Sequence, residues 1–134
     1  MKGGGGGGVE GKDDIFVEAD NQRLTQVISN LISNALKFMS KEKEGLISII
    51  LEKQDHGDGN ADAIITVKDT GTGIDPEIFP RLFSKFASKS FQGTGLGLFI
   101  SKSIVEAHGG KMWAKNNNTD GATFHFSIPI SKKQ

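Results

Sequence analysis

One stretch of the chain, residues 20–39, has the apolar spacing of a long amphipathic helix. The apolar side chains recur every three or four positions, at Leu24, Val27, Ile28, Leu31, Ile32, Ala35 and Phe38. Asp20 is a suitable N-cap, because its carboxylate can accept hydrogen bonds from the free N–H groups of the first turn. A helix with a single apolar face is stable only when that face is buried against a second layer. The remainder of the chain must supply that layer.

Four later segments have the composition of β-strands. They are residues 46–52, 63–68, 111–115 and 122–128. We expect the first two to pair antiparallel across a polar loop, QDHGDGNAD, and the last two to close the chain. In the last segment Phe124 and Phe126 alternate with His125, so that both aromatic rings lie on one face.

Two further helices are expected between these strands. A short one begins at residues 75–77, where Pro in the first turn and two acidic side chains suit a helix start. A longer one runs from about Gly97 to Ala107 and stops at His-Gly-Gly, because glycine suits a left-handed C-cap. Residues 87–94 are small and polar and are expected to form a loop. The predicted fold is an α+β two-layer sandwich, in which a mixed, mostly antiparallel sheet is covered on one face by about three helices.

Length and composition limit the possible functions. The chain has 134 residues, enough for one domain; we expect residues 1–12, with six consecutive glycines, to form a flexible tail and residues 13–134 the domain. The formal net charge is zero, which disfavours nucleic acid or an anionic membrane as the main partner. There is no cysteine for a thiolate or zinc site, and no apolar run of the roughly 18 to 20 residues that cross a bilayer. We therefore expect a soluble domain without membrane contact.

A strip of polar residues runs beside the apolar face of the first helix. On a helical wheel Asn30, Asn34 and Lys37 fall within about 60° of one another. An amide oxygen is a hard, neutral ligand that suits Mg²⁺, and a lysine offers a positive charge to phosphate. The alternative is that the two amides only solvate the margin of the apolar face.

Two glycine-containing motifs could bind a nucleotide. Residues 69–73 (DTGTG) follow a predicted strand, where a carboxylate can accept from an exocyclic amine and glycines let a flat ring approach the backbone. Residues 93–98 (GTGLGL) join a loop to a helix N-terminus, whose free N–H groups bind phosphate without any net basic charge. The alternatives are an ordinary strand-ending turn for the first motif and a hinge without ligand for the second.

In this order the motifs resemble those of a known family, the ATP-binding catalytic domain of sensor histidine kinases. Its superfamily also holds DNA gyrase, heat-shock chaperone and mismatch-repair ATPases. The N box is similar to NLISNALKF (residues 30–38), the first glycine box to DTGTGI (69–74), the F box to LFSKF (82–86) and the second glycine box to GTGLGL (93–98). The closing hairpin, GATFHFSIP (121–129), matches as well. The resemblance implies the two-layer α/β sandwich of the Bergerat type.

The resemblance implies a set of residues around the phosphates of ATP. Asn34 would coordinate the bridging Mg²⁺, Asn30 would support the same site, and Lys37 would reach a phosphate. Residues 75–94 would form the ATP lid, and Phe83 and Phe86 of the F box would anchor that lid or face a partner domain. The second glycine box would wrap the phosphates, with Gly93, Thr94, Gly95, Leu96, Gly97 and Leu98.

The resemblance also implies an adenine site. Asp69 would accept a hydrogen bond from the adenine amino group. Gly71 and Gly73 would let the ring sit against the backbone, and Thr123 would contribute from the last strand.

One departure bears on the reaction. Hydrolytic members of the superfamily carry a Glu one turn before the metal-binding Asn, whereas this chain has Asn30, and an amide does not take a proton near neutral pH. We therefore expect little ATP hydrolysis and, instead, presentation of the γ-phosphate to a histidine on a separate dimerisation domain. The chain's own histidines are expected to be structural: His56 in a polar loop, His108 at a helix end where a cation suits the dipole, and His125 on a strand.

The resemblance thus implies the catalytic half of a two-component sensor histidine kinase. Its partners would be ATP or ADP, the histidine-bearing dimerisation domain and, downstream, a response regulator; the isolated domain would be a monomer of low activity. Two alternatives remain. One is a serine kinase of the anti-sigma-factor type, which is disfavoured because the N box and the F box match those of histidine kinases closely. The other is a nucleotide-binding docking module without transfer activity, disfavoured by the intact Asn34, Asp69 and second glycine box.

Overall fold

The computed structural model describes residues 15–39, 44–85 and 96–130. Four of the predictions fall outside these residues. They concern the glycine-rich tail at 1–12, the loop at 87–94, the F-box residue Phe86, and the first three residues of the second glycine box, Gly93, Thr94 and Gly95.

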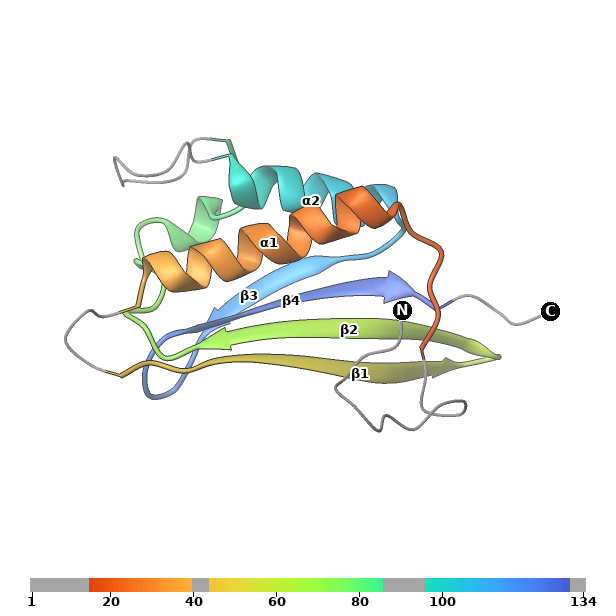
Figure 1. The fold of residues 1–134 in the computed structure, drawn as a ribbon, viewed down its shortest axis with the longest axis horizontal. Coiled ribbons are helices and arrows are strands. Elements are labelled where there is room, and N and C mark those ends of the chain that lie inside the picture. The colour runs from red at the N-terminus through yellow and green to blue at the C-terminus, as the bar shows by residue number, and fades with distance from the viewer. Residues whose placement is uncertain (1–14, 40–43, 86–95, 131–134) are drawn as a thin grey trace.

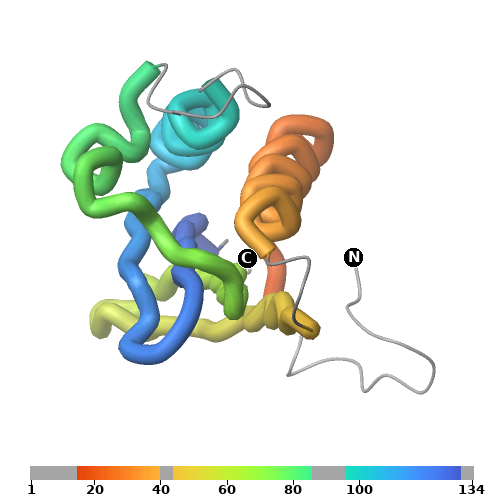
Figure 2. The backbone as a smooth tube through the Cα atoms, turned by 90° about the vertical axis from the view of Figure 1, so that its left-hand side faces the viewer, coloured from red at the N-terminus to blue at the C-terminus, as the bar shows by residue number. Residues whose placement is uncertain are grey.

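The described chain forms two layers, a sheet and a pair of helices lying on one of its faces (Figure 1; Figure 2 shows the same layers from the side). The elements are α1 (Asn21–Lys37), β1 (Ile47–Gly57), β2 (Asn60–Asp69), η1 (Phe79–Arg81), α2 (Gly97–Ala107), β3 (Met112–Asn116) and β4 (Ala122–Pro129). The strand order is β1-β2-β4-β3, and every neighbouring pair is antiparallel. The predicted α+β sandwich is confirmed.

The core lies between α1 and the helix-facing side of the sheet. Val27 and Leu31 of α1 are buried against Phe124, Phe126 and other apolar residues of the strands. These are the side chains that the helical spacing and the strand alternation single out. The α1 start is also confirmed, because Asp20 Oδ1 accepts from the backbone N–H groups of Gln22 (3.0 Å) and Arg23 (3.1 Å).

The predicted polar loop between the first two strands is wrong. Strand pairing continues through most of it, and the chain reverses at Asp58 and Gly59, both with positive φ (54° and 75°). Two consecutive residues with positive φ give the twist that a tight hairpin needs. Across the extended hairpin His56 Nε2 lies 2.6 Å from Asp62 Oδ2. Pairing with a neighbouring strand thus outweighs the low intrinsic strand preference of these polar residues.

The short helix expected after residue 75 is reduced to a turn and one 3₁₀ segment, η1. Asp75 caps the turn that precedes η1, since its Oδ1 accepts from the N–H of Glu77 (2.9 Å). Pro80 stands inside η1 and has no N–H, so a helical hydrogen bond to residue 76 cannot form. The helix layer therefore consists of two α-helices and this single turn, rather than three helices.

Glycine lets α2 turn back onto the sheet. The helix ends at the C-cap His108, after which Gly109 has φ +82°. At Gly110 the backbone passes so close to β4 that an added Cβ would lie 1.7 Å from the carbonyl oxygen of Ser127.

We predict that Gly110→Ala destabilises the protein by about 3 kcal/mol, because backbone atoms of β4 would have to move. Gly59→Ala is the control, since an added Cβ there meets no atom within 4 Å and only the positive φ is unfavourable, at about 1 kcal/mol. Urea unfolding measures both free energies. Equal losses in the two variants would contradict the close contact at Gly110.

Candidate nucleotide-binding site

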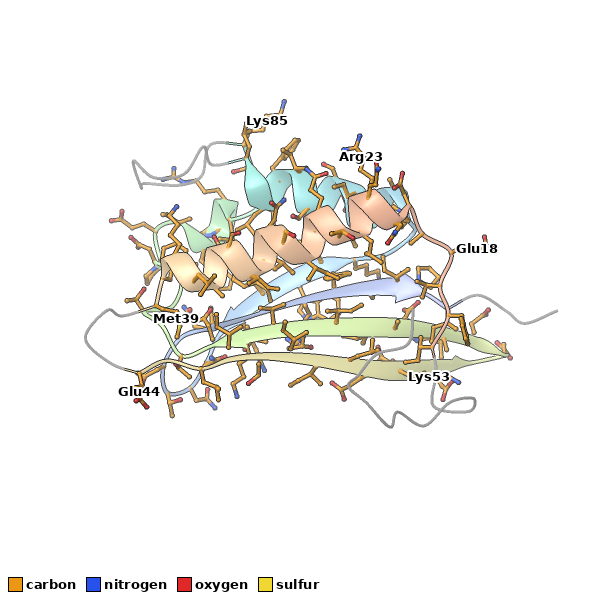
Figure 3. All side chains as sticks on the ribbon, in the orientation of Figure 1. Glu18, Arg23, Met39, Glu44, Lys53 and Lys85 are labelled. Atoms are coloured by element: carbon orange, nitrogen blue, oxygen red, sulfur yellow. The ribbon has the colours of Figure 1, made fainter. Side chains whose placement is uncertain are left out.

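Most of the predicted site residues that the structure describes lie toward one end of the molecule. The C-terminal end of α1, the end of β2 and the first turn of α2 lie at this same end (Figure 1). Thr72 N donates to Phe38 O (3.1 Å), which ties the loop after β2 to the end of α1. In Figure 3 the labelled side chains Met39 and Lys85 mark this end, with Lys85 projecting outward above the start of α2.

Asp69 is the buried acidic group of this region, with 3% of its surface exposed. Its Oδ1 accepts two backbone N–H groups, from Gly71 (2.8 Å) and from Ala122 at the start of β4 (3.3 Å). Among the described residues nothing donates to its Oδ2. One carboxylate oxygen is therefore fixed by the fold, and the other remains as an acceptor for a ligand amine.

The glycines near the Asp69 carboxylate stand where a side chain would collide with neighbouring atoms or where the backbone has a positive φ. An added Cβ at Gly71 would lie 2.4 Å from Phe38 O, so the end of α1 explains that glycine. Gly73 has φ +82°, which disfavours other residues. Gly121 combines φ +86° with the closest approach, because an added Cβ would lie 2.1 Å from Asp69 O and 2.6 Å from its Oδ1.

Two residues that position Asp69 were missed by sequence reasoning. Gly121 admits the carboxylate, and Asn117 Nδ2 donates to the backbone oxygens of Asp69 (3.0 Å) and Asp120 (2.9 Å). The sequence does point to Gly121, since it is the first residue of the hairpin motif at 121–129. Asn117 carries none, because it lies 48 residues from Asp69 in sequence.

The polar strip of α1 faces α2 in part. Asn30 Nδ2 donates to Ser101 Oγ (3.0 Å) and Gly97 O (3.3 Å), so this amide fixes the start of α2. Asn34, one turn later, is half-buried and forms no hydrogen bond with the described residues. Lys37 places its Nζ 5.5 Å from the centroid of the Phe38 ring and has no acidic partner in the described part of the chain. Asn34 and Lys37 thus remain available to a ligand.

The first turn of α2 has open space in front of it. Among the described residues, an added Cβ at Gly97 would meet nothing closer than Asn30 Cγ at 3.9 Å, so neither their packing nor φ requires glycine. No side chain caps the helix at Leu96, and the first-turn N–H groups, including that of Leu98, have no helical acceptors. This helix end is suited to an anion that approaches the backbone at Gly97 closely.

The Thr123 side chain is not brought to this site. Strand alternation and the pairing of Thr123 with Lys68 place it on the sheet face opposite α1 and α2, where its Oγ1 donates to Asn117 Oδ1. There it lines a shallow hollow of about 410 Å³ together with Lys68, Lys115 and His125. Ala122, the preceding residue, meets Asp69 instead, through its backbone N–H.

His125 on that open face is held by its neighbours. Its ring stacks on Trp113 with centroids 5.1 Å apart, and its Nδ1 lies 2.9 Å from Thr66 Oγ1. Burial lowers the pKa of His125, and the Lys115 ammonium lowers it further, against an opposite effect of Glu52. Because the folded state favours the neutral ring, its contribution to stability is present above pH 6.5 and is lost as the pH falls.

The donor set limits which metal the site could hold. No three His, Cys, Asp or Glu side chains gather into a metal centre within residues 15–39, 44–85 and 96–130. The free amide of Asn34 fits a hard cation such as Mg²⁺ that takes its other ligands from phosphate and water. Of the helices described, none has the length and apolar character needed to span a membrane.

Comparison with known proteins gives the family. Residues 19–132 match the family model described as histidine kinase-, DNA gyrase B- and HSP90-like ATPase. Phytochrome-like protein Cph1 of Synechocystis sp. is 43% identical over 119 residues, 85% of this chain and 15% of that protein. Sensor histidine kinase WalK of Bacillus subtilis is 35% identical over 127 residues, 90% of this chain and 20% of that protein. The chain thus spans a fifth or less of these two relatives.

Solved structures agree with this family. The catalytic domain of histidine kinase ThkA, in a nucleotide-free form, superposes with a TM-score of 0.71 at 37% identity, over 84% of this chain and 70% of that one. The shared fold and the matched sequence lead to one conclusion. This chain belongs to the histidine kinase-, DNA gyrase B- and HSP90-like ATPase family, as an ATP-binding catalytic domain of the sensor histidine kinase type.

Proposed function

We propose that this domain binds Mg-ATP and donates the γ-phosphoryl group to a histidine on a separate dimerisation domain. Asp69 carries the proposal: its Oδ1 is fixed by two backbone N–H groups and its Oδ2 is left as an acceptor at the edge of the site. That oxygen accepts the adenine amino group, and the phosphates lie toward Gly97 and the first turn of α2.

The triphosphate side is served by three groups. The N–H groups at the start of α2, together with those of the second glycine box, hold phosphate oxygens; Lys37 adds a positive charge. Asn34 supplies the protein ligand of Mg²⁺, which when bound neutralises phosphate charge. These groups position the γ-phosphate, and they contain no nucleophile of their own.

Phosphoryl transfer, rather than hydrolysis, is favoured by the role of Asn30. Its amide nitrogen donates to Ser101 Oγ and Gly97 O, so the side chain holds α2 and cannot act as a base toward water. The acceptor is therefore a histidine of the parent kinase, whose phosphoryl group passes to a response regulator. The proposal places the domain on the cytoplasmic side, where ATP is available, as a monomer when isolated.

Calorimetry and a transfer assay test the two halves of the proposal separately. ATP is titrated into the domain with and without Mg²⁺, with GTP as the control; we expect adenine-selective, Mg-sensitive binding. Transfer is then measured with radiolabelled ATP and a histidine-bearing dimerisation domain of the parent kinase. Binding without transfer would support a docking module instead, and transfer to a serine would support the serine-kinase alternative.

Gly97→Ala separates binding from stability. The methyl group has space in the protein, and alanine favours a helix more than glycine, so we expect unchanged or slightly raised stability, by up to about 0.5 kcal/mol. ATP affinity should fall about tenfold or more, because the methyl group occupies the space of the phosphates. Ser103→Ala, on the exposed side of the same helix, is the control and should leave affinity unchanged. If Gly97→Ala and Ser103→Ala bind ATP with equal affinity, the phosphates do not lie against Gly97.

Asp69→Asn tests the adenine contact. The amide oxygen of Asn can still accept from Gly71 and Ala122, so the fold should persist. The amide nitrogen then takes the place of Oδ2 and presents a donor to the adenine amine, which should cost about tenfold or more in ATP affinity and reduce discrimination against GTP. Asp62→Asn, at the other end of the same strand, is the control. Undiminished preference for ATP over GTP in Asp69→Asn would exclude the contact.

Asn34→Asp tests the metal ligand. A carboxylate beside the triphosphate adds a like charge, so we expect Mg-ATP to bind about tenfold more weakly while the fold is kept. Asn21→Asp makes the same change in the exposed first turn of α1, away from the site. If both variants bind Mg-ATP as the unmodified protein does, Asn34 has no part in holding the metal.

A further inference from the structure

His108 connects the beginning of α1 to the end of α2. It is the C-cap residue of α2, and its Nδ1 lies 2.8 Å from the carbonyl oxygen of Ile104 in the last turn of that helix. On the other side of the ring, Nε2 accepts from the backbone N–H of Asp20 at 3.0 Å. Asp20 is the N-cap of α1, 88 residues away in sequence.

These two contacts fix the protonation of the ring. A carbonyl oxygen can only accept, so Nδ1 must carry the hydrogen; a backbone N–H can only donate, so Nε2 must carry a lone pair. His108 is therefore the neutral Nδ1–H form. In this geometry the ring acts as a donor toward Ile104 O and as an acceptor toward the Asp20 N–H.

The same two helices are tied a second time, close to the nucleotide site. Asn30 of α1 donates to Ser101 and Gly97 of α2. The α2 helix has 11 residues, about 16 Å, so the His108 and Asn30 contacts hold it near its two ends. A displacement of the α1 start relative to α2 is thereby transmitted to the turn that begins at Gly97.

Asp20 is also where the preceding segment joins the helix layer. Residues 15–19 run along the end of the molecule into α1, and Val17 forms a β-bridge with Ile130 (Figure 1). The Asp20 backbone therefore belongs both to this segment and to the α1 cap, with its side chain accepting from the first turn of α1 and its carbonyl oxygen accepting from Leu24 N (2.8 Å).

We infer that His108 is a positioning residue that couples the segment entering at Asp20 to the phosphate-facing first turn of α2. The inference rests on the proposed function in one respect, that the first turn of α2 binds phosphate. The link between Asp20 and α2 does not depend on it, because it consists of the two hydrogen bonds of the His108 ring. Movement of the preceding segment changes the nucleotide site through this ring, without touching the nucleotide.

Nuclear magnetic resonance of the whole chain tests which ring nitrogen of His108 carries the hydrogen and whether the Asp20 amide is hydrogen-bonded. The ¹⁵N shifts of His108 should show a protonated Nδ1 and an unprotonated Nε2 at pH 7.5, and the Asp20 amide should exchange slowly with solvent. His56, exposed on the hairpin, is the internal comparison. A protonated Nε2, or an Asp20 amide that exchanges as fast as exposed amides do, overturns the link whether or not the domain binds ATP.

Two substitutions test the coupling. His108→Leu removes both hydrogen bonds and should expose the amides of the first turn of α2 to faster exchange and weaken ATP binding about three- to tenfold. His108→Gln keeps an acceptor near the position of Nε2 and should restore affinity to within about twofold. Gly59→Ala, a destabilising change in the β1–β2 turn, shows whether loss of stability alone weakens binding.

The outcomes separate this inference from the proposed function. If the unmodified protein binds no ATP, the proposed function fails, while the ring and exchange measurements still decide whether His108 links Asp20 to α2. If ATP binds and His108→Leu is folded, unchanged exchange at the first turn of α2 together with unchanged affinity overturns the coupling. If His108→Leu does not fold, His108→Gln decides: a protected Asp20 amide with ATP affinity reduced by more than about twofold, or a freely exchanging Asp20 amide with unchanged affinity, overturns the coupling.

Discussion

The site depends on the burial of one carboxylate, that of Asp69 at the end of β2. A buried carboxylate is costly unless hydrogen bonds replace its hydration, and here two backbone N–H groups do so through a single oxygen, Oδ1. One donor belongs to the following loop and the other to β4, so the same contact fixes both segments. The absence of a side chain at Gly121 makes this approach possible. Since Oδ1 meets the requirement of the fold, Oδ2 is free to recognise a ligand.

In the proposed function, the helix layer meets a second requirement, that of binding phosphate on a chain with no formal net charge. The first turn of α2 provides N–H groups and the positive end of the helix dipole, which act locally and need no basic patch. Asn30 fixes this turn against α1 from the side, and the His108 ring fixes the opposite end of α2 to the cap of α1. Polar contacts thus set the relative position of two helices whose apolar faces would otherwise allow them to slide.

Much of this arrangement was predictable from local pattern. The 3.6-residue spacing predicts α1 and its cap, and Gly97 and His-Gly-Gly predict the ends of α2. The same spacing puts Asn30, Asn34 and Lys37 on one strip of α1. The errors arose where partners distant in sequence decide. Residues 54–57 and 60–62 are mostly polar, yet they form strand because all but His56, which lies at a register shift, have a partner across the hairpin. Pro80 limits the helix after Asp75 to a single 3₁₀ turn, and the strand register places the Thr123 side chain on the open face.

The sequence by itself determined the fold class, the family and the chemical types that meet at the site, because periodicity and short motifs are local properties of a chain. Only the tertiary structure decided how those groups are used. It showed that Gly71 makes room for the end of α1, that Gly121 and Asn117 hold Asp69, and that the carboxylate has one fixed and one free oxygen. It also showed which groups the two ring nitrogens of His108 face, the carbonyl oxygen of Ile104 and the N–H of Asp20, and these groups assign one nitrogen as donor and the other as acceptor. Each of these facts joins segments up to 88 residues apart, and contacts of that kind exist only once the layers have packed.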